Sequence, residues 1–523
     1  MTDQRQVRHR PDRHGGQNEQ AGPGSVALAE LQRALLPAAL PVLPRARIAA
    51  HYLAAATSQQ AGGDWFDAVT LPGGQVALVV GDVVGHGVPA VAAMGQLRSV
   101  LGELLASDPD LLGAVRRADA FAARNPDLRA ATLAIAELDP ATGSVWYITC
   151  GHPPPLVIGR GGGTSLLPVT GTGPLGTGSE PVLGRTCLQP GELLMLFSDG
   201  LIQRPQVSVA ESIAELRECA TEAVGRAAAS AAGAPPERVC QHAISTLTGR
   251  GYGDDVTALA AELVADPVPE LVMEFPAEAD SVLGVRRAFA AWLKQIDAAV
   301  VDANDLLLAV VETVTNAVEH AYREDAPGMV GFRATLREDG NLECQVTDHG
   351  RWQRPAPATG NRGHGLMVAS QVVDTMRISH AMPPAGAASG SRGTVVTLRH
   401  RLRRPASVTT DISDRPAEPY SAVAFRMEID SRGTEPCAKV SGPVDGSTAD
   451  RLTKQALAAC RGGTLPITLD LTGITYLASS GIRALYQVKA HLTAHQQDLT
   501  ILAQANSSAH ALLDMARLPH ISR

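Results

Sequence analysis

Hydrophobic and polar positions divide this 523-residue chain into three stretches that each mix strand-like and helical patterns. From Ala46 to about Val264, short apolar runs such as QVALVVGD, ATLAIAEL and LLMLFSDGLI predict strands, with helical patterns between them. A second α/β stretch follows from Leu271 to about Leu402, and residues 421–523 have strand and helix patterns of their own. Because 523 residues exceed one ordinary core, the sequence predicts a multidomain protein of α+β and α/β class.

Polar and proline-rich segments separate these stretches. Leucines 28, 31, 35 and 36 recur at helical spacing before Pro37, which predicts one helix ahead of the first domain. The expected order is a disordered tail (1–24), a helix (25–45), a first domain (46–264), a linker (265–270), a second domain (271–402), another linker (403–420) and a third domain (421–523).

Net charge and cysteine usage indicate which partners and which cellular compartment to expect. The formal net charge of −8 gives no reason to expect nucleic acid or an anionic membrane as a partner. Seven cysteines are scattered without a C-x-x-C pair, which indicates free thiols in a reducing cytosol and no zinc site. No apolar run reaches about 18 residues and no signal-peptide pattern is visible, so we expect a soluble, cytoplasmic protein.

Aspartates stand directly beside glycine at four places in the first domain. They lie in GGDWFD (Asp64), GDVVGHG (Asp82), LFSDGLI (Asp199) and GYGDDVT (Asp254 and Asp255). Any one of these places could be a simple turn, because aspartate and glycine are common turn residues. Four such places in order favour carboxylates that converge on two hard divalent cations, which can clamp a phosphoryl group and activate a water.

With their flanking motifs, these aspartates resemble the SpoIIE-type branch of the metal-dependent protein phosphatase 2C superfamily. The resemblance covers roughly residues 25–264 and includes LQRALLP, GGDWFD, GDVVGHG, CGHPPPLV, PLGTG, LLMLFSDGLI and GDDVTAL. It implies a β-sandwich with flanking helices, two Mn²⁺ or Mg²⁺ ions, and hydrolysis of phosphoserine or phosphothreonine. It also implies that LQRALLP belongs to a regulatory helix that couples a signal to the active site.

The same resemblance implies roles for individual residues. Asp64 and Asp82 would bind metal, with the carbonyl of Val83 as a further ligand. Asp199 and Asp254 would complete the second metal site. A metal-bound hydroxide would attack the phosphoryl group directly, without a phosphoenzyme, so Asp82 counts as catalytic as well as a ligand.

In the second domain, DLLLAVVETVTNAVEHAY (305–322) reads as a helix with Glu312, Asn316 and His320 on one face. A solvated helix face alone would explain the glutamate and the histidine. Asparagine is a poor helix former, however, and its side-chain oxygen can ligate Mg²⁺ beside a carboxylate. Glycine-rich turns follow in TDHG, RGHGL and RGTVVTL, where backbone N–H groups can approach phosphates.

This ordered series resembles the GHKL ATPases, which have the Bergerat α/β-sandwich fold, and most closely their anti-sigma-factor serine kinases. The resemblance spans about residues 271–402 and implies binding of ATP with Mg²⁺, and often a homodimer. No dimerisation helix with a phosphoacceptor histidine is visible, which sets a sensor histidine kinase aside. The implied roles are a Mg²⁺ ligand (Asn316), an acceptor for the adenine amino group (Asp348), a frame around the nucleotide (Gly350, Gly363, Gly365 and Thr394) and a general base (Glu312).

In the third domain, PITLDLTGI reads as a strand and SSGIRALYQVKAHL as an amphipathic helix. Ser479 and Ser480 start that helix, where serine is a preferred N-cap and a phosphate would meet the favourable end of the helix dipole. Residues 421–518 resemble the STAS domains of anti-sigma factor antagonists. On that resemblance Ser479 is the phosphoacceptor with Ser480 beside it, and Ala478 stands where the family has aspartate.

Together the three resemblances imply a partner-switching regulator of transcription. A phosphatase and a kinase would act in opposition on a serine of a STAS-domain anti-anti-sigma protein, in this chain or another. Their balance would set how much sigma factor the kinase-like domain holds. Two alternatives stay open: a non-enzymatic scaffold whose GHKL and STAS domains bind these partners, and a phosphatase whose other domains only sense nucleotide.

Overall fold

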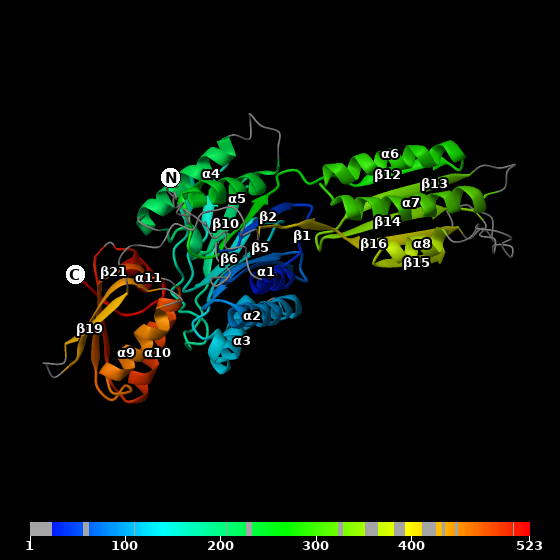
Figure 1. Ribbon diagram of the computed structural model, residues 1–523. Helices are drawn as coiled ribbons and strands as arrows, with labels where there is room; N and C mark the ends of the chain where they lie inside the picture. Colours follow the sequence, from blue (N-terminus) through cyan, green and yellow to red (C-terminus); the bar gives the residue numbers. More distant parts are fainter. Residues whose placement is uncertain are drawn as a thin grey trace, which may run out of the picture.

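The computed structural model describes parts of all three domains, and Figure 1 shows the first domain between the other two. No helix in these parts combines the length and apolar character needed to span a membrane. The seven cysteines all lie in them and are free thiols, as their spacing predicts. The described segments are 23–55, 62–108, 110–204, 207–225, 233–322, 328–350, 365–380, 393–409, 425–430, 435–444, 448–477, 479–505 and 507–523.

The first domain is a β-sandwich. One sheet has the order β18-β2-β11-β10-β7-β8, with strands β2 (Ala46–Leu53), β7 (Leu156–Ile158), β8 (Thr164–Leu166), β10 (Leu193–Phe197), β11 (Val256–Leu263) and β18 (Ser407–Thr409). The facing sheet has the order β3-β4-β5-β6-β9, with strands β3 (Gly63–Thr70), β4 (Val76–Val83), β5 (Thr132–Leu138), β6 (Ser144–Cys150) and β9 (Gly184–Cys187).

Helices cover both outer faces of the sandwich. Helix α2 (Val88–Ser107) packs on β3 and β4 with α3 (Leu111–Arg124) beside it, and α5 (Pro235–Leu247) packs on β2 and β11 with α4 (Val209–Gly225) beside it. Every residue of β4 and of β11 is buried, because these strands have a sheet on one side and a helix on the other. The part of this domain that the structure describes also contains short 3₁₀ helices at η1 (Pro126–Leu128), η2 (Asp199–Leu201) and η4 (Thr248–Arg250).

Two segments that the sequence places outside the sandwich belong to it. The predicted first helix is α1 (Pro23–Leu35), which ends before Pro37, and β1 (Ala39–Pro41) follows it. Strand β17 (Arg403–Pro405) pairs with β1, and β18 pairs with β2 in parallel. Of residues 403–409, predicted to be linker, β17 therefore forms a separate two-stranded sheet with β1, and β18 extends the six-stranded sheet at its β2 edge.

The second domain is a two-layer sandwich of helices on an antiparallel sheet. The strand order is β12-β13-β14-β16-β15, with β12 (Leu271–Pro276), β13 (Met329–Leu336), β14 (Asn341–Asp348), β15 (Thr375–His380) and β16 (Thr394–Arg401). Helices α6 (Ala279–Gln295), α7 (Val300–His320) and α8 (Gly365–Val372) form the other layer. The core between the layers is centred on Phe289, which meets Phe332 of β13 edge to face and stacks on Trp292.

The third domain is an α/β domain with a mainly parallel sheet. The strand order is β19-β20-β21-β22-β23, with β19 (Arg426–Asp430), β20 (Cys437–Val444), β21 (Ile467–Leu477), β22 (Leu499–Ala503) and β23 (Ile521–Ser522). Only β19 runs antiparallel to its neighbour. Helices α9 (Ala449–Ala459), α10 (Ser479–Ala494) and α11 (Ser508–Met515) bury their apolar faces against the sheet.

Candidate active sites

Strand pairing brings the aspartates of the first domain together. Asp64 on β3 lies directly opposite Asp82 near the end of β4. Asp199 follows β10 as the first residue of η2, and Asp254 and Asp255 immediately precede β11, the neighbour of β10. These five residues, here called the aspartate cluster, therefore come from both sheets of the sandwich, at the ends that the sequence motifs indicate.

The aspartate cluster is buried and strongly electronegative. Asp64 is 3% exposed and Asp82 is 5% exposed, and Thr257 Oγ1 on the facing sheet donates a 2.9 Å hydrogen bond to Asp64 Oδ2. Burial and the neighbouring carboxylates raise the pKa of Asp64 and of Asp254 well above the usual range. Burial and then the charge of Asp82 raise the pKa of Asp199 to about 7. Such a set of oxygens fits hard divalent cations, whose charge would offset the repulsion.

Glycines in the motifs allow the backbone to approach these acids closely. A Cβ atom on Gly63 would lie 1.9 Å from the carbonyl oxygen of Val83, and one on Gly200 would lie 2.1 Å from that of Asp255. No side chain fits at either distance. The glycines of GGDWFD and LFSDGLI are therefore needed to bring the strand ends, and the Val83 carbonyl, into the cluster.

Asp255 differs from its neighbour Asp254 in its hydrogen bonds. Its carboxylate accepts bonds from the backbone N–H groups of Ala55 (2.7 Å) and Gly62 (3.0 Å) and from the hydroxyl of Tyr52. With its oxygens already engaged by the protein, Asp255 is suited to hold the strand ends in place. Asp254 as a metal ligand stays a prediction from the resemblance.

Gln32 is a functional candidate that the sequence reasoning missed. It lies on α1, inside LQRALLP, and is fully buried. Its side-chain Nε2 lies 2.7 Å from Asp255 Oδ2 and 3.1 Å from the Gly62 carbonyl, so α1 reaches the aspartate cluster directly. The available signal was its position, since Gln32 is four residues from both Leu28 and Leu36 and so interrupts an apolar helical stripe.

We expect Gln32→Ala to destabilise the first domain by about 1–3 kcal/mol, because a buried carboxylate loses a donor. The midpoint temperature of thermal unfolding and the rate of Mn²⁺-dependent phosphate release should both fall. Glu30→Ala, at an exposed position of the same helix, is the matched control and should leave both unchanged. If Gln32→Ala and Glu30→Ala have the same unfolding temperature and the same rate of phosphate release, Gln32 has no role at the cluster.

In the second domain, the predicted base and Mg²⁺ ligand are half-buried on α7. Glu312 and Asn316 lie one turn apart on this helix, whereas His320 at its end is exposed. Helix α7 packs against β14, and Asp348 is the last residue of that strand. The Tyr322 hydroxyl accepts a 2.8 Å hydrogen bond from the backbone N–H after Asp348, which ties the end of α7 to the end of β14.

The Asp348 carboxylate is held by the backbone. Its Oδ1 accepts hydrogen bonds from the N–H groups of Gly350 (3.0 Å) and Thr394 (3.3 Å). The side chain is 6% exposed, and burial raises the pKa of the carboxyl. A Cβ atom on Gly350 would lie 1.8 Å from the carbonyl oxygen of Ala321, so glycine is required where this turn meets the end of α7. The second carboxylate oxygen can then accept a hydrogen bond from a ligand amino group.

The other predicted nucleotide residues are only partly described. Thr394 begins β16, and Gly365 begins α8, which packs against α7. Gly363 lies outside the described residues, as does the segment RWQRPAPATGNR (351–362) before it. Their contribution to the site stays a prediction from the sequence.

In the third domain, α10 begins at Ser479, as the serine motif predicts. Ala478 and the side chains of Ser479 and Ser480 lie outside the described residues. One turn further along α10, Arg483 Nη1 donates a 3.1 Å hydrogen bond to the carbonyl of Val84 in the first domain. Val84 is two residues beyond Asp82, so α10 contacts the loop that leaves the aspartate cluster.

A cavity of about 210 Å³ lies beside this contact between the two domains. Its walls carry charged and polar groups from both sides. The first domain contributes Val84, Gly85, His86, Pro89, Ala90 and Asp127, and the third contributes Ala449, Asp450, Thr453, Arg483, Ala484 and Gln487. Helices α9 and α10 thus face the same loop of the first domain.

Comparison with protein families agrees with this order of domains. Residues 72–264 match the model of stage II sporulation protein E (SpoIIE), residues 275–400 match the histidine kinase-like ATPase domain, and residues 427–522 match the Mlab, STAS domain. These matches confirm the three resemblances and the multidomain α+β and α/β fold that the sequence predicts.

Individual relatives cover different parts of the chain. The crystal structure of the RsbU and RsbW domains of Rv1364c from Mycobacterium tuberculosis is 37% identical, with a TM-score of 0.63, and the match covers 72% of this chain and 99% of that one. Protein IcfG of Synechocystis is 29% identical over 204 residues, which are 33% of this chain but only 31% of that protein's length. The serine-protein kinase RsbW of Bacillus cereus is 29% identical over 126 residues, 21% of this chain and 78% of that protein.

Proposed function

The chain belongs to the family of multidomain proteins that join an RsbU-type SpoIIE phosphatase domain to an RsbW-type ATPase domain, and on this premise we propose that it is a partner-switching regulator. Its first domain removes phosphate from a STAS-domain serine, and its second domain adds phosphate with ATP as donor. The balance of the two reactions controls binding of a sigma factor. We choose a STAS domain as the substrate because the chain's own STAS domain contacts the loop that follows Asp82.

For the phosphatase reaction, we assign the cations to carboxylates of the cluster. Asp64, Asp82, Asp199 and Asp254 would hold two Mn²⁺ or Mg²⁺ ions, with the Val83 carbonyl as a further ligand. When bound, the ions stabilise the phosphoryl charge and activate a water. The cluster's own part is to hold ligand oxygens in a buried place, where their mutual repulsion favours exchange of protons for cations.

For the kinase reaction, the name of the RsbW relative supports transfer to serine. Asp348 would accept a hydrogen bond from the adenine amino group, and Asn316 would hold Mg²⁺ at the phosphates. Glu312, one helical turn before Asn316, would take the proton from the incoming serine hydroxyl as that oxygen attacks the γ-phosphorus. Its half-buried position on α7 leaves the carboxylate accessible to a substrate.

The chain's own STAS domain is the substrate that the domain contact favours. Arg483 is four residues after Ser479, so these two positions share one face of α10. The Arg483 side chain binds the carbonyl of Val84, which follows the predicted metal ligands Asp82 and Val83. That face of α10 is thus turned toward the phosphatase in the same chain, which supports dephosphorylation of Ser479 in cis.

Phosphopeptide mass spectrometry after incubation of the full chain with Mg-ATP tests this assignment. We expect phosphate to accumulate on Ser479 or Ser480 in Asp82→Asn. Arg483→Ala should also accumulate phosphate there, with phosphate removal slowed about 10–150-fold, because losing a hydrogen bond to a charged donor costs about 1.5–3 kcal/mol. Dephosphorylation in cis should also proceed at a rate that does not change on dilution.

Arg426→Ala, at an exposed arginine on β19 of the same domain, is the matched control and should behave as wild type. Absence of phosphoserine in Asp82→Asn would exclude this STAS domain as the substrate. A rate proportional to protein concentration would assign the reaction to separate chains. Absence of any label from ATP in every variant would instead favour the scaffold, in which the second and third domains only bind partners.

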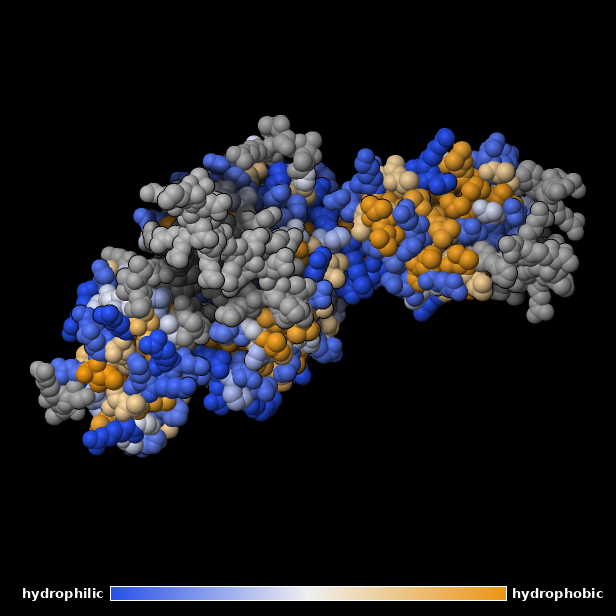
Figure 2. All heavy atoms as spheres, in the orientation of Figure 1, coloured by the Kyte–Doolittle hydropathy of each residue, from blue (hydrophilic) through white to orange (hydrophobic). Residues whose placement is uncertain are grey.

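A protein partner for the second domain is supported by its surface. Figure 2 shows apolar side chains gathered on the visible face of this domain. Val272 on β12, Leu283 on α6, and Val300 and Val301 at the start of α7 are 56%, 49%, 76% and 69% exposed. Exposed apolar groups of this kind suit a protein interface, and we assign it to a sigma factor or to a second copy of the chain.

A further inference from the structure

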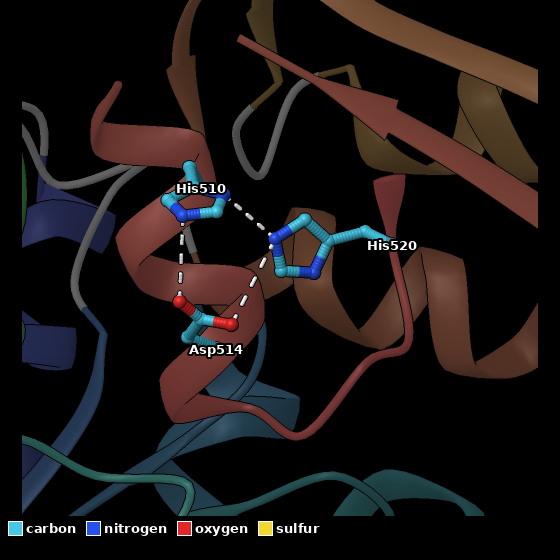
Figure 3. Close-up of side chains that lie close together, drawn as sticks. All are labelled: His510, Asp514 and His520. Carbon is cyan, nitrogen blue, oxygen red and sulfur yellow. Dashed lines mark hydrogen bonds and ion pairs between the residues drawn. The ribbon is translucent and has the colours of Figure 1, made fainter. Parts of the chain in front are cut away.

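Two histidines and an aspartate meet at the C-terminal end of the third domain, far along the chain from both catalytic sites. Figure 3 shows His510 and Asp514 on one face of α11 and His520 reaching toward them from the segment before β23. One nitrogen or oxygen atom of each residue lies within 4.8 Å of the others. His520 Nε2 is 2.8 Å from His510 Nδ1 and 3.8 Å from Asp514 Oδ1.

The orientation of His520 is fixed by a backbone contact. Its Nδ1 lies 2.9 Å from the carbonyl oxygen of Leu518, which can only accept a hydrogen bond. In neutral His520, Nδ1 therefore carries the proton and Nε2 presents its lone pair to the cluster. The side chain is 6% exposed, so this lone pair points into a largely buried place. A second ring nitrogen bonded to a backbone carbonyl is the arrangement that commonly orients metal-binding histidines.

His510 has neighbours at both ring nitrogens. Its Nδ1 faces the His520 lone pair and lies 3.1 Å from Ser522 Oγ, and its Nε2 is 3.6 Å from Asp514 Oδ2. The cluster therefore presents a carboxylate and the His520 lone pair to a space between three side chains. Either an added proton on His510 or a bound cation would compensate these electron-rich groups.

We propose that His510, Asp514 and His520 form a binding site for a divalent transition-metal ion, with Zn²⁺ as the best fit. Two imidazoles and one carboxylate match the ligands that Zn²⁺ takes in proteins, at about 2.0–2.1 Å. Ligand atoms of a tetrahedral ion then lie about 3.3 Å apart. The separations of 2.8 and 3.8 Å to His520 Nε2 bracket this value and all three ligand atoms lie within 4.8 Å of one another, so side-chain rotations complete the site.

This site is distinct in chemistry from those in the other domains. Mg²⁺ prefers oxygen ligands, whereas imidazole suits Zn²⁺ and its transition-metal neighbours. The cysteine spacing predicts no zinc site, and no cysteine takes part here. The two histidines are ten positions apart in the chain and meet because α11 leads back to the edge of the sheet.

A bound ion would join the end of the chain to α11. Strand β23 has two residues and pairs only with β22, so it has few hydrogen bonds of its own. Helix α11 packs on β21 and also touches α4 of the first domain. The ion would thus stabilise the edge of the STAS sheet and the helix through which that domain meets the phosphatase.

Titration of the metal-free full chain with Zn²⁺ alone, with binding measured by calorimetry, tests the proposal. His520→Gln and Asp514→Ala should each lose one equivalent of bound Zn²⁺ or bind it at least about 10–100-fold more weakly, the range already seen when an outer partner of a ligand is lost. The midpoint temperature of thermal unfolding should rise when Zn²⁺ is added to wild type. It should rise less in both variants. The visible absorption of Co²⁺ bound to wild type should be that of a four-coordinate ion. Both variants should lose this absorption.

His495→Gln, at an exposed histidine of the same domain, is the control and should bind like wild type. Asp514 is 64% exposed, so Asp514→Ala is expected to fold and decides the test if His520→Gln does not. Zn²⁺ binding of the same stoichiometry and affinity in wild type and Asp514→Ala would overturn the proposal. Because the variants and the control keep both catalytic sites, ions bound at the aspartate cluster cancel in the comparison, and a failure here leaves the proposed function unaffected.

Discussion

Asp82→Asn is expected to slow release of phosphate from a phosphorylated STAS domain by at least about 10³-fold, because several kcal/mol of transition-state stabilisation depend on the cations it helps to hold. Asp82 lies directly opposite Asp64 in the β3–β4 pair, so both carboxylates would help to hold the cations. Phosphate release with Mn²⁺ in excess measures the effect. An unchanged rate would show that the phosphatase assignment is wrong.

This variant should lose activity without losing its fold. The charge of Asp82 raises the pKa of Asp64, Asp199 and Asp254, so replacing it with a neutral amide of the same shape relieves repulsion. Without metal, the midpoint temperature of thermal unfolding should therefore be no lower in this variant than in wild type. Asp108→Asn, at an exposed position after α2, is the matched control and should keep full activity.

Asp348→Asn is expected to weaken ATP binding about 10–150-fold, which corresponds to losing a hydrogen bond worth about 1.5–3 kcal/mol. The carboxylate uses Oδ1 to accept from Gly350 and Thr394, which leaves its other oxygen for the adenine amino group. An asparagine that keeps the two backbone bonds must turn its own NH₂ toward that amino group. Two donors would then face each other.

The same geometry predicts a change in base preference. Guanine carries a carbonyl where adenine carries the amino group, so Asp348→Asn should lose most of its discrimination between ATP and GTP. Fluorescent-nucleotide displacement measures both affinities. Asp339→Asn, at an exposed turn between β13 and β14, serves as control. Wild-type ATP affinity in Asp348→Asn would exclude this residue from the nucleotide site.

The candidate site residues stand in short motifs that could be found in the sequence. Asp64, Asp82 and Asp199 stand beside glycines that the structure requires, since a Cβ on Gly63 or Gly200 would collide with backbone. Glu312 and Asn316 share a helix face because of helical spacing alone. Helical spacing acts within a few residues, whereas the two glycines are required by backbone far along the chain, Val83 for Gly63 and Asp255 for Gly200.

Contacts between distant segments had no such local signal. Gln32 reads as one polar residue in a helix until α1 is packed against the sandwich, where it meets Asp255 across 223 positions of the chain. The strands at residues 403–409 read as a linker because their partners, β1 and β2, lie more than 350 residues earlier. Backbone pairing of a sheet edge depends little on side-chain identity, so composition could not reveal it.

By itself, the sequence determined three domains in order and their fold classes, because strand, turn and helix patterns are set by nearby residues, and it singled out the acids and glycines that we propose for two catalytic sites. Only the tertiary structure decided that α1 reaches the aspartate cluster, that α10 meets the loop after Asp82, and that His510 and His520 come together. Each of these contacts joins surfaces whose fit depends on packing, which no short stretch of the chain encodes.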